Sequence, residues 1–143
     1  MIRYIRLAAT ALMLADCSPT TVPIDQVAMY GGIDREANPT LRKGDQELID
    51  GAVSAFGSRR KSSKAWADKA FRDYASGNCQ NGIRRFNQAW LLDKSNPESY
   101  WGFGLWYGHL GDREAEQKMF EKAYGLGLRE EEFLKTYRES KTQ

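Results

Sequence analysis

The sequence predicts an all-α fold, a short array of stacked helical hairpins, and three observations support this prediction. The stretch from residue 66 to residue 124 contains one pattern twice, and the same interval separates every matched pair. Apolar residues within each copy recur at helical spacing. Residues that start and stop helices flank each expected helix. The matched pairs are Trp66 and Tyr100, Gly77 and Gly111, Asn78 and Asp112, Phe86 and Phe120, Ala89 and Ala123, and Trp90 and Tyr124.

Residues 1–17 have the composition of an export signal. Arg3 and Arg6 give a positively charged start, and an apolar stretch follows that is too short for a comfortable membrane span. It ends in Leu14-Ala15-Asp16-Cys17. This ending resembles the lipobox of bacterial lipoproteins, which implies cleavage before Cys17 and attachment of lipid, palmitate included, to that residue.

The lipoprotein resemblance also implies a location, the bacterial cell envelope. Ser18 follows the cysteine and is not the Asp associated with inner-membrane retention, so a periplasm-facing outer-membrane anchor is expected. Asp16 departs from the small residue that a lipobox prefers. Plain secretion, with a disulfide between Cys17 and Cys79, and an uncleaved anchor therefore stay open as alternatives.

Residues 18–43 are expected to form a flexible tether. They contain Pro19, Pro23 and Pro39 and a Gly31-Gly32 pair, and no helical or strand period persists. Residues 44–62 are expected to form an N-terminal capping helix and a basic loop. The helix presents one apolar face, formed by Leu48, Ile49, Ala52, Val53 and Phe56.

The basic residues between this helix and the first repeat are Arg59, Arg60, Lys61 and Lys64. They are expected to lie in a solvated loop or to contact anionic lipid or an acidic protein surface. Ala55 precedes Ala89 by the same interval that separates the two copies. The capping helix is therefore also a candidate for the second half of a degenerate earlier repeat.

Residues 63–96 and 97–130 are the two repeats. In the second, Asn96 is a suitable N-cap and Pro97 suits the first helical position. The helix dipole favours the negative charge of Glu98 in the first turn. Gly111 can take a left-handed conformation and Asp112 can cap the next helix. Small residues are expected where helices approach closely, and large ones between them: Gly104, Ala70, Ala89 and Ala123 against Phe86 and Phe120.

The second copy reads Tyr100-x-x-Phe103-Gly104-x-x-Tyr107, then Gly111-Asp112, then Phe120-x-x-Ala123. This pattern and its period resemble the tetratricopeptide repeat (TPR). Departures occur at Lys69 and Asp73, at Gly82 and Glu116 where the family has Ala, and at Lys94 and Leu128 where it has Pro. The resemblance implies helix–turn–helix units that stack into a superhelix and bind other proteins.

The resemblance also implies a binding face on the first helix of each repeat. Its expected positions in the first repeat are Lys64, Ala67, Phe71, Tyr74 and Ala75, and in the second Glu98, Trp101, Leu105, Gly108 and His109. The partner-binding residues singled out are Lys64, Phe71, Tyr74, Trp101, Leu105 and His109. An alternative is that residues 18–43 fold back into this groove against Trp101.

Residues 131–143 are expected to form a closing helix and tail, with Phe133, Leu134 and Tyr137 on one face. Repeat arrays need about three units or caps to bury a continuous core. The two flanking helices meet that need, or the domain pairs with itself.

No catalytic set can be assembled from the motifs, so we expect no enzyme activity, no metal and no cofactor. His109 has no second ligand beside it, Cys79 is expected to be inert, and Glu130 to Glu132 are interpreted as a solvated charge run. The net charge of +2 argues against a nucleic-acid partner. The expected function is docking of an unidentified protein or peptide in the envelope. The alternative is a small-ligand or glycan-binding periplasmic lipoprotein, because the chain is rich in aromatic residues.

Overall fold

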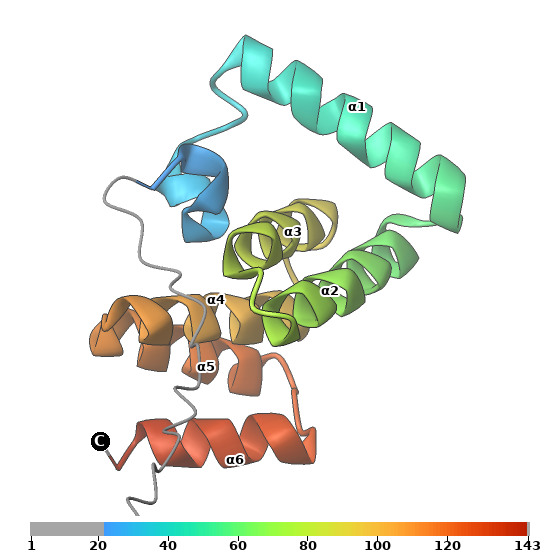
Figure 1. Ribbon diagram of the computed structural model, residues 1–143. Helices are drawn as coiled ribbons and strands as arrows, with labels where there is room; N and C mark the ends of the chain where they lie inside the picture. Colours follow the sequence, from blue (N-terminus) through green and yellow to red (C-terminus); the bar gives the residue numbers. More distant parts are fainter. Residues whose placement is uncertain (1–21, 143) are drawn as a thin grey trace, which may run out of the picture.

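The computed structural model describes residues 22–142 of the chain. Within that range the fold is all-helical and contains no strand. The signal-like segment and Cys17 lie outside the described residues. Figure 1 shows the arrangement, in which helices stack from α1 at one end to α6 at the other. In chain order the elements are η1 (Ile24–Gln26), η2 (Ala28–Gly32), α1 (Pro39–Phe56), α2 (Arg59–Ala75), α3 (Cys79–Leu92), α4 (Pro97–Leu110), α5 (Arg113–Gly125) and α6 (Glu131–Ser140).

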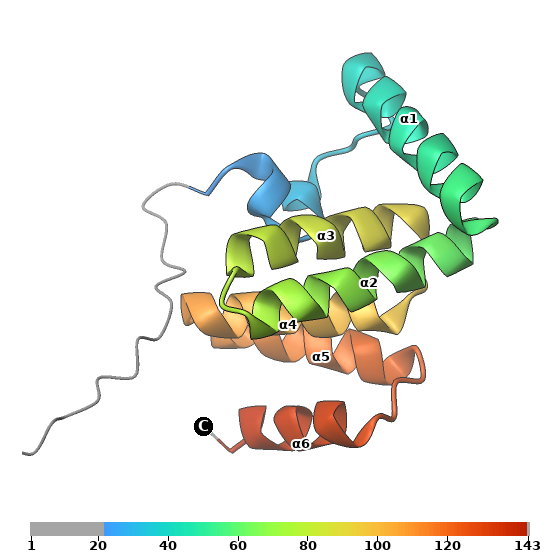
Figure 2. The same cartoon turned by 45° about the vertical axis from the view of Figure 1, so that its right-hand side comes forward.

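Two helical hairpins, α2–α3 and α4–α5, form the centre of the stack, as Figure 2 shows from a second direction. Each turn has the chemistry that the sequence predicts. Gly77 and Gly111 adopt φ of 83° and 78°, a left-handed backbone that favours glycine. The side chains of Asn78 and Asp112 then accept hydrogen bonds from the backbone N–H groups that start α3 and α5.

Close helix approach explains the small residues. A Cβ atom built on Gly104 would lie 2.2 Å from the ring of Phe120, so α4 and α5 can only pack this tightly around a glycine. Gly102 allows the same close approach between the two hairpins, because a Cβ there would lie 2.4 Å from Phe86. The first contact is as predicted, whereas the sequence pattern does not predict the role of Gly102. Ala70, Ala89 and Ala123 are fully buried, as their expected packing requires.

Helix α6 closes the stack by adding its aromatic face to α4 and α5. Phe133 is fully buried, and its ring centroid lies 5.7 Å from that of Trp101 and 6.1 Å from that of Phe120. Tyr137 lies 6.4 Å from Phe120. These edge-to-face contacts stabilise the end of the array beyond the area that they bury. A closing helix in this region was expected.

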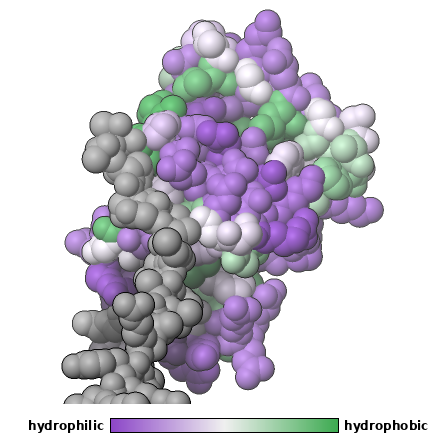
Figure 3. All heavy atoms as spheres, in the orientation of Figure 1, coloured by the Kyte–Doolittle hydropathy of each residue, from purple (hydrophilic) through white to green (hydrophobic). Residues whose placement is uncertain are grey.

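Helix α1 is longer than expected and differs from a repeat helix. It begins at Pro39 rather than near residue 44, because Asn38 caps it. Only Ala52 of its apolar face is buried. Figure 3 shows hydrophobic residues, in green, at the surface in this upper part of the molecule. Ala55 is exposed, whereas Ala89 and Ala123 are fully buried, so α1 is not the second helix of an earlier repeat.

The predicted basic loop is helical. Ser58 accepts a hydrogen bond from the backbone of Lys61, so α2 starts at Arg59, before the expected residue 63. Arg59 donates to the carbonyl oxygens of Leu91 (2.9 Å) and Leu92 (2.8 Å) at the end of α3. A guanidinium at a helix C-terminus is favourable, which explains one member of the basic cluster by structure alone.

The expected tether, residues 18–43, is described from residue 22 onward: residues 22–38 pack on the helices, and residues 39–43 belong to α1. Ala28 and Tyr30 are 3% and 7% exposed and belong to the main core. The fully buried Asn87 of α3 accepts a hydrogen bond from the Tyr30 N–H and donates to the carbonyls of Asp25 and Val27. The flexible-tether prediction is therefore corrected for this segment, because a buried amide on α3 pairs with its backbone.

Candidate protein-docking groove

A groove of about 530 Å³ runs across three helices that are not consecutive in the chain. They are α2, α4 and α6, the first helix of each hairpin and the closing helix. Helix α4 begins at Pro97 and helix α6 begins at Glu131. The number of residues between these two starts equals the number between the repeats that start at residues 63 and 97. Helix α6 therefore extends the row that α2 and α4 begin. The lining residues are Lys64, Asp68, Phe71, Tyr74, Ala75, Glu98, Trp101, Leu105, Glu130, Glu132 and Thr136.

Most residues predicted for the binding face are in this lining. Lys64, Phe71, Tyr74, Trp101 and Leu105 all contribute, and so do Ala75 and Glu98. The structure thus brings together side chains that the sequence places on two separate helices.

His109 is the exception among the singled-out partner-binding residues. It is exposed in the last turn of α4 and does not line the groove. The preceding Gly108 lies against Glu116, whose carboxylate occupies the place of a side chain. Ala67, also placed on the face, is fully buried in the core. The centre of the expected face therefore lies in the groove, and its far end lies outside.

Aromatic rings form the floor of the groove. The ring centroid of Phe71 lies 4.6 Å from that of Trp101 and 4.8 Å from that of Phe86. Trp101 is 6% exposed, and its indole Nε1 has no hydrogen-bond partner among the described residues. A buried donor without a partner is unusual in a folded protein.

Tyr74 joins two walls of the groove. Its hydroxyl donates to the carbonyl oxygen of Leu105 at 2.9 Å, which links α2 to α4. Burial, aided by the nearby charge of Glu116, raises the pKa of Tyr74 to about 12. The phenol therefore stays protonated and keeps donating at any physiological pH. Gly82 provides the room that this ring needs, since a Cβ there would lie 3.3 Å from it.

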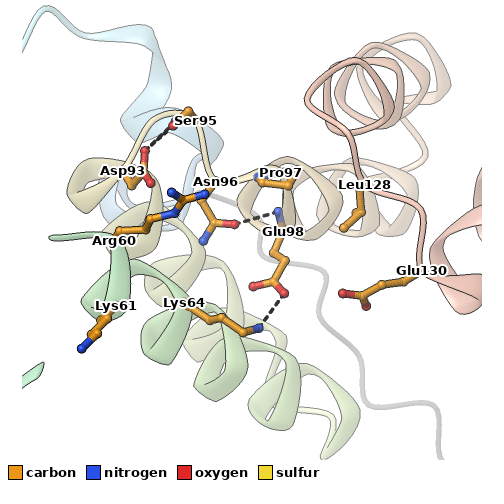
Figure 4. Close-up of a pocket in the computed structure, with 10 residues that line it drawn as sticks. All are labelled: Arg60, Lys61, Lys64, Asp93, Ser95, Asn96, Pro97, Glu98, Leu128 and Glu130. Carbon is orange, nitrogen blue, oxygen red and sulfur yellow. Dashed lines mark hydrogen bonds and ion pairs between the residues drawn. The ribbon is translucent and has the colours of Figure 1, made fainter. Parts of the chain in front are cut away.

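A second cavity of about 550 Å³ continues the groove at one end. Figure 4 shows its lining, with Lys64 and Glu98 bonded to each other and Glu130 pointing toward Glu98 from the start of α6. Lys64, Glu98 and Glu130 line both cavities. The two cavities are thus one continuous surface, and Arg60 and Lys61 lie only at its outer end.

Electrostatics in the shared region centre on Glu98. Its carboxylate accepts a hydrogen bond from Lys64 at 2.9 Å, and Lys64 also lies 3.5 Å from Asp68. The hydrogen bond raises the pKa of Lys64. Burial raises the pKa of Glu98 as well, against the influence of Lys64 and with help from Asp68 and Glu130. The pair attracts, but desolvation of the carboxylate outweighs that attraction.

The sequence reasoning missed some of the lining residues: Asp68, Glu130, Glu132 and Thr136. The last three belong to α6 or its N-cap, and the run at 130–132 was expected to be a solvated face. The repeat period was the signal that could have found them, because it places residue 131 where residue 97 stands in the preceding unit.

Other kinds of site have little support in the described part of the chain. Within residues 22–142 no three His, Cys, Asp or Glu side chains come together as a metal site. No helix in that range combines the length and apolarity needed to cross a bilayer. Cys79 is 6% exposed. The only other cysteine in the sequence is Cys17, and a sulfur that carries lipid cannot also form a disulfide.

No protein-family model matches the chain, and comparisons with curated proteins and with solved structures give no match.

Proposed function

We propose that this protein is a non-catalytic docking module that holds a segment of a partner protein in the groove formed by α2, α4 and α6. The supporting observation is the aromatic floor of that groove, where Phe71, Tyr74 and Trp101 lie together with an unpartnered indole N–H. Aromatic side chains in a concave surface are the residue types that dominate binding energy. A cavity of about 530 Å³ is within the range of ligand sites.

The N-terminal segment supports an accessible groove. None of residues 22–38 lines either cavity, and they pack instead on α3 through Asn87. In its described part, the alternative in which the tether fills the groove is thus disfavoured. The tetratricopeptide-like interpretation of the hairpins belongs to this proposal, because their turns repeat at the same interval as the family's.

A protein segment is favoured over a glycan as the occupant. A sugar stacks on the open face of an aromatic ring, and Trp101 is 6% exposed because Phe71 and Phe133 lie against it. The edges of Phe71, Tyr74 and Leu105 instead offer apolar depressions between helices. Such depressions fit individual side chains of an extended or helical segment.

The proposed location is the bacterial envelope, through export and lipidation of Cys17, with the periplasmic side of the outer membrane favoured. It rests on the sequence of residues 1–18. The secreted alternative, in which Cys79 forms a disulfide with Cys17, shares the export step but leaves the protein free of the membrane.

The direct test fills the groove without touching the core. Ala75 is exposed and lines the groove, so Ala75→Trp should block it while the fold stays intact. Ala55→Trp is the matched control, an exposed helical alanine of α1 that lines neither cavity. A partner is first identified by photo-crosslinking from position 75, and its affinity for each purified variant is then measured.

We expect Ala75→Trp to weaken partner binding by about tenfold or more, as loss of a central contact does. Ala55→Trp should leave the affinity unchanged. Equal affinity of both variants for the crosslinked partner would remove the groove from consideration as the docking site.

A further inference from the structure

The groove carries far more negative than positive charge beside its aromatic floor. Asp68, Glu98, Glu130 and Glu132 contribute four carboxylates, and Lys64 contributes the one cation of this lining. Lys64 is already shared between Glu98 and Asp68. Within residues 22–142, neither Glu130 nor Glu132 has an ion-pair partner, and the charge imbalance is concentrated on the α6 side.

Two polar atoms of the lining are unpartnered in addition. One is Oε2 of Glu98, whose side chain is 12% exposed, and the other is Nε1 of Trp101, whose residue is 6% exposed. Buried polar atoms in native proteins nearly always have a partner, and a ligand that fills this cavity would lie beside both residues. The Trp101 donor is independent of the acidic cluster.

We propose that the occupant of this groove is a segment of a partner protein that places a Lys or Arg side chain between Glu98, Glu130 and Glu132, with its alkyl stem against Phe71. This deepens the docking function proposed above and rests on it. The cation supplies the charge that the four carboxylates lack. The stem and the neighbouring residues bury apolar surface on the rings, as long basic side chains do.

Other occupants fit less well for stated reasons. An acidic segment would face four carboxylates with one shared ammonium between them, and like charges at close range oppose binding. An anionic lipid surface meets the same repulsion. A neutral apolar segment would bury its side chains on the rings but leave Oε2 of Glu98 without a partner. The basic Arg60 and Lys61 lie in the outer cavity and do not line this part.

The test uses synthetic peptide pools and the full chain. Each pool has one fixed central residue, Arg, Lys, Gln or Glu, and the same randomised mixture of apolar and small residues on both sides. Binding is measured by fluorescence anisotropy of the labelled pools at low and high salt. We expect the Arg and Lys pools to bind about tenfold more tightly than the Gln pool, and the Glu pool most weakly, with the preference decreasing in salt.

The carboxylates are tested by a matched pair of double variants. Glu130→Gln with Glu132→Gln should reduce the preference for Arg over Gln to about twofold, because the pairing charges are gone. Glu114→Gln with Glu121→Gln changes the net charge equally at exposed positions on α5 that line neither cavity, and should leave the preference intact.

The outcomes separate this proposal from the docking function. If all pools bind equally and Ala75→Trp abolishes that binding, the groove docks peptides and the basic preference is overturned. A tighter Glu pool, or a preference that survives Glu130→Gln with Glu132→Gln, overturns the basic preference as well. Binding that Ala75→Trp does not affect, or no binding of any pool, overturns both.

Discussion

The side chain of Asn87, at the centre of α3, accepts a hydrogen bond from the backbone N–H of Tyr30 at 2.9 Å across 57 residues of sequence. Tyr30 has a left-handed backbone, with φ of 50°, which is uncommon for a residue other than glycine. The amide of Asn87 therefore holds a turn of the N-terminal segment that the backbone alone would not favour. This contact holds the N-terminal segment against α3.

The first prediction concerns that contact. Asn87→Leu should destabilise the protein by about 1–3 kcal/mol, because it leaves the Tyr30 N–H without a partner in the core. The loss should appear in hydrogen exchange as faster exchange of the amides of residues 28–33, while α4 to α6 keep their protection. Asn87→Asp turns a buried carboxylate toward the carbonyl oxygens of Asp25 and Val27, so at neutral pH it should destabilise the protein at least as much as Asn87→Leu. Unchanged exchange in Asn87→Leu would show that the segment docks by other means.

The second prediction concerns the glycines between helices. Gly104→Ala and Gly102→Ala should each cost about 1–3 kcal/mol, because the added methyl meets the ring of Phe120 or Phe86. Gly51→Ala is the control, a helical glycine of α1 with nothing within 4 Å of its missing Cβ. It should stabilise the protein by about 0.5–1 kcal/mol, since alanine favours the helix. Chemical denaturation gives the free energy of unfolding of all three variants. The same change in all three would contradict the close-packing argument.

The third prediction concerns the pH dependence set by Glu98. The pKa of its carboxyl is raised in the folded protein by burial, so folding favours the neutral form. That contribution is fully present below the ordinary value of 4.5 and is lost as the pH rises through the raised value. Glu98→Gln, always neutral, should therefore melt at a higher temperature than the wild type at neutral pH. The difference should shrink below the ordinary value.

Exposed Glu114→Gln provides the comparison for this experiment, because its carboxylate is in solvent. Its melting temperature should follow the wild type throughout. A lower melting temperature for Glu98→Gln at neutral pH would mean that the hydrogen bond from Lys64 outweighs the desolvation of the carboxylate.

The fourth prediction concerns the N-terminus. If Cys17 anchors the protein, labelled palmitate enters the wild type and not Cys17→Ser, and Cys17→Ser leaves the membrane fraction. Cys79 then reacts with a thiol reagent once the protein is unfolded, because lipid occupies the other sulfur. If the wild type takes up no lipid and shows no reactive thiol before reduction, the lipid-anchor prediction is wrong and a disulfide between Cys17 and Cys79 is indicated instead.

The fifth prediction separates groove binding from groove stability. Trp101→Ala removes a ring in contact with Phe71 and Phe133 and should cost about 3–5 kcal/mol of stability, so it is a poor test of binding. Trp101→Phe keeps most of the ring and removes the unpartnered Nε1. It should leave the melting temperature within a few degrees and weaken partner binding by about fivefold, the loss of one hydrogen bond. Unchanged affinity would mean that the indole N–H does not contact the partner.

The sequence by itself determined the local units and their repetition. Gly77 and Gly111 stop helices, Asn78 and Asp112 start the next ones, and the apolar spacing identifies the faces that pack. These signals act within a few residues, and for that reason the two hairpins and the centre of the groove could be predicted. Phe71, Tyr74 and Trp101 lie on the inner face of their helices wherever those helices go.

Only the tertiary structure decided the contacts between distant segments. In the sequence Asn87 is an ordinary polar position on a helix. In the structure its side chain forms hydrogen bonds with the backbone of residues 25–30. Glu130 and Glu132 look like solvated charges, until α6 stacks against Trp101 and carries them to the edge of the groove. Gly102 looks like a weak helical position, until Phe86 of the neighbouring hairpin fills its place. In each case the partner is distant along the chain, and the energy of the contact depends on packing that no local pattern encodes.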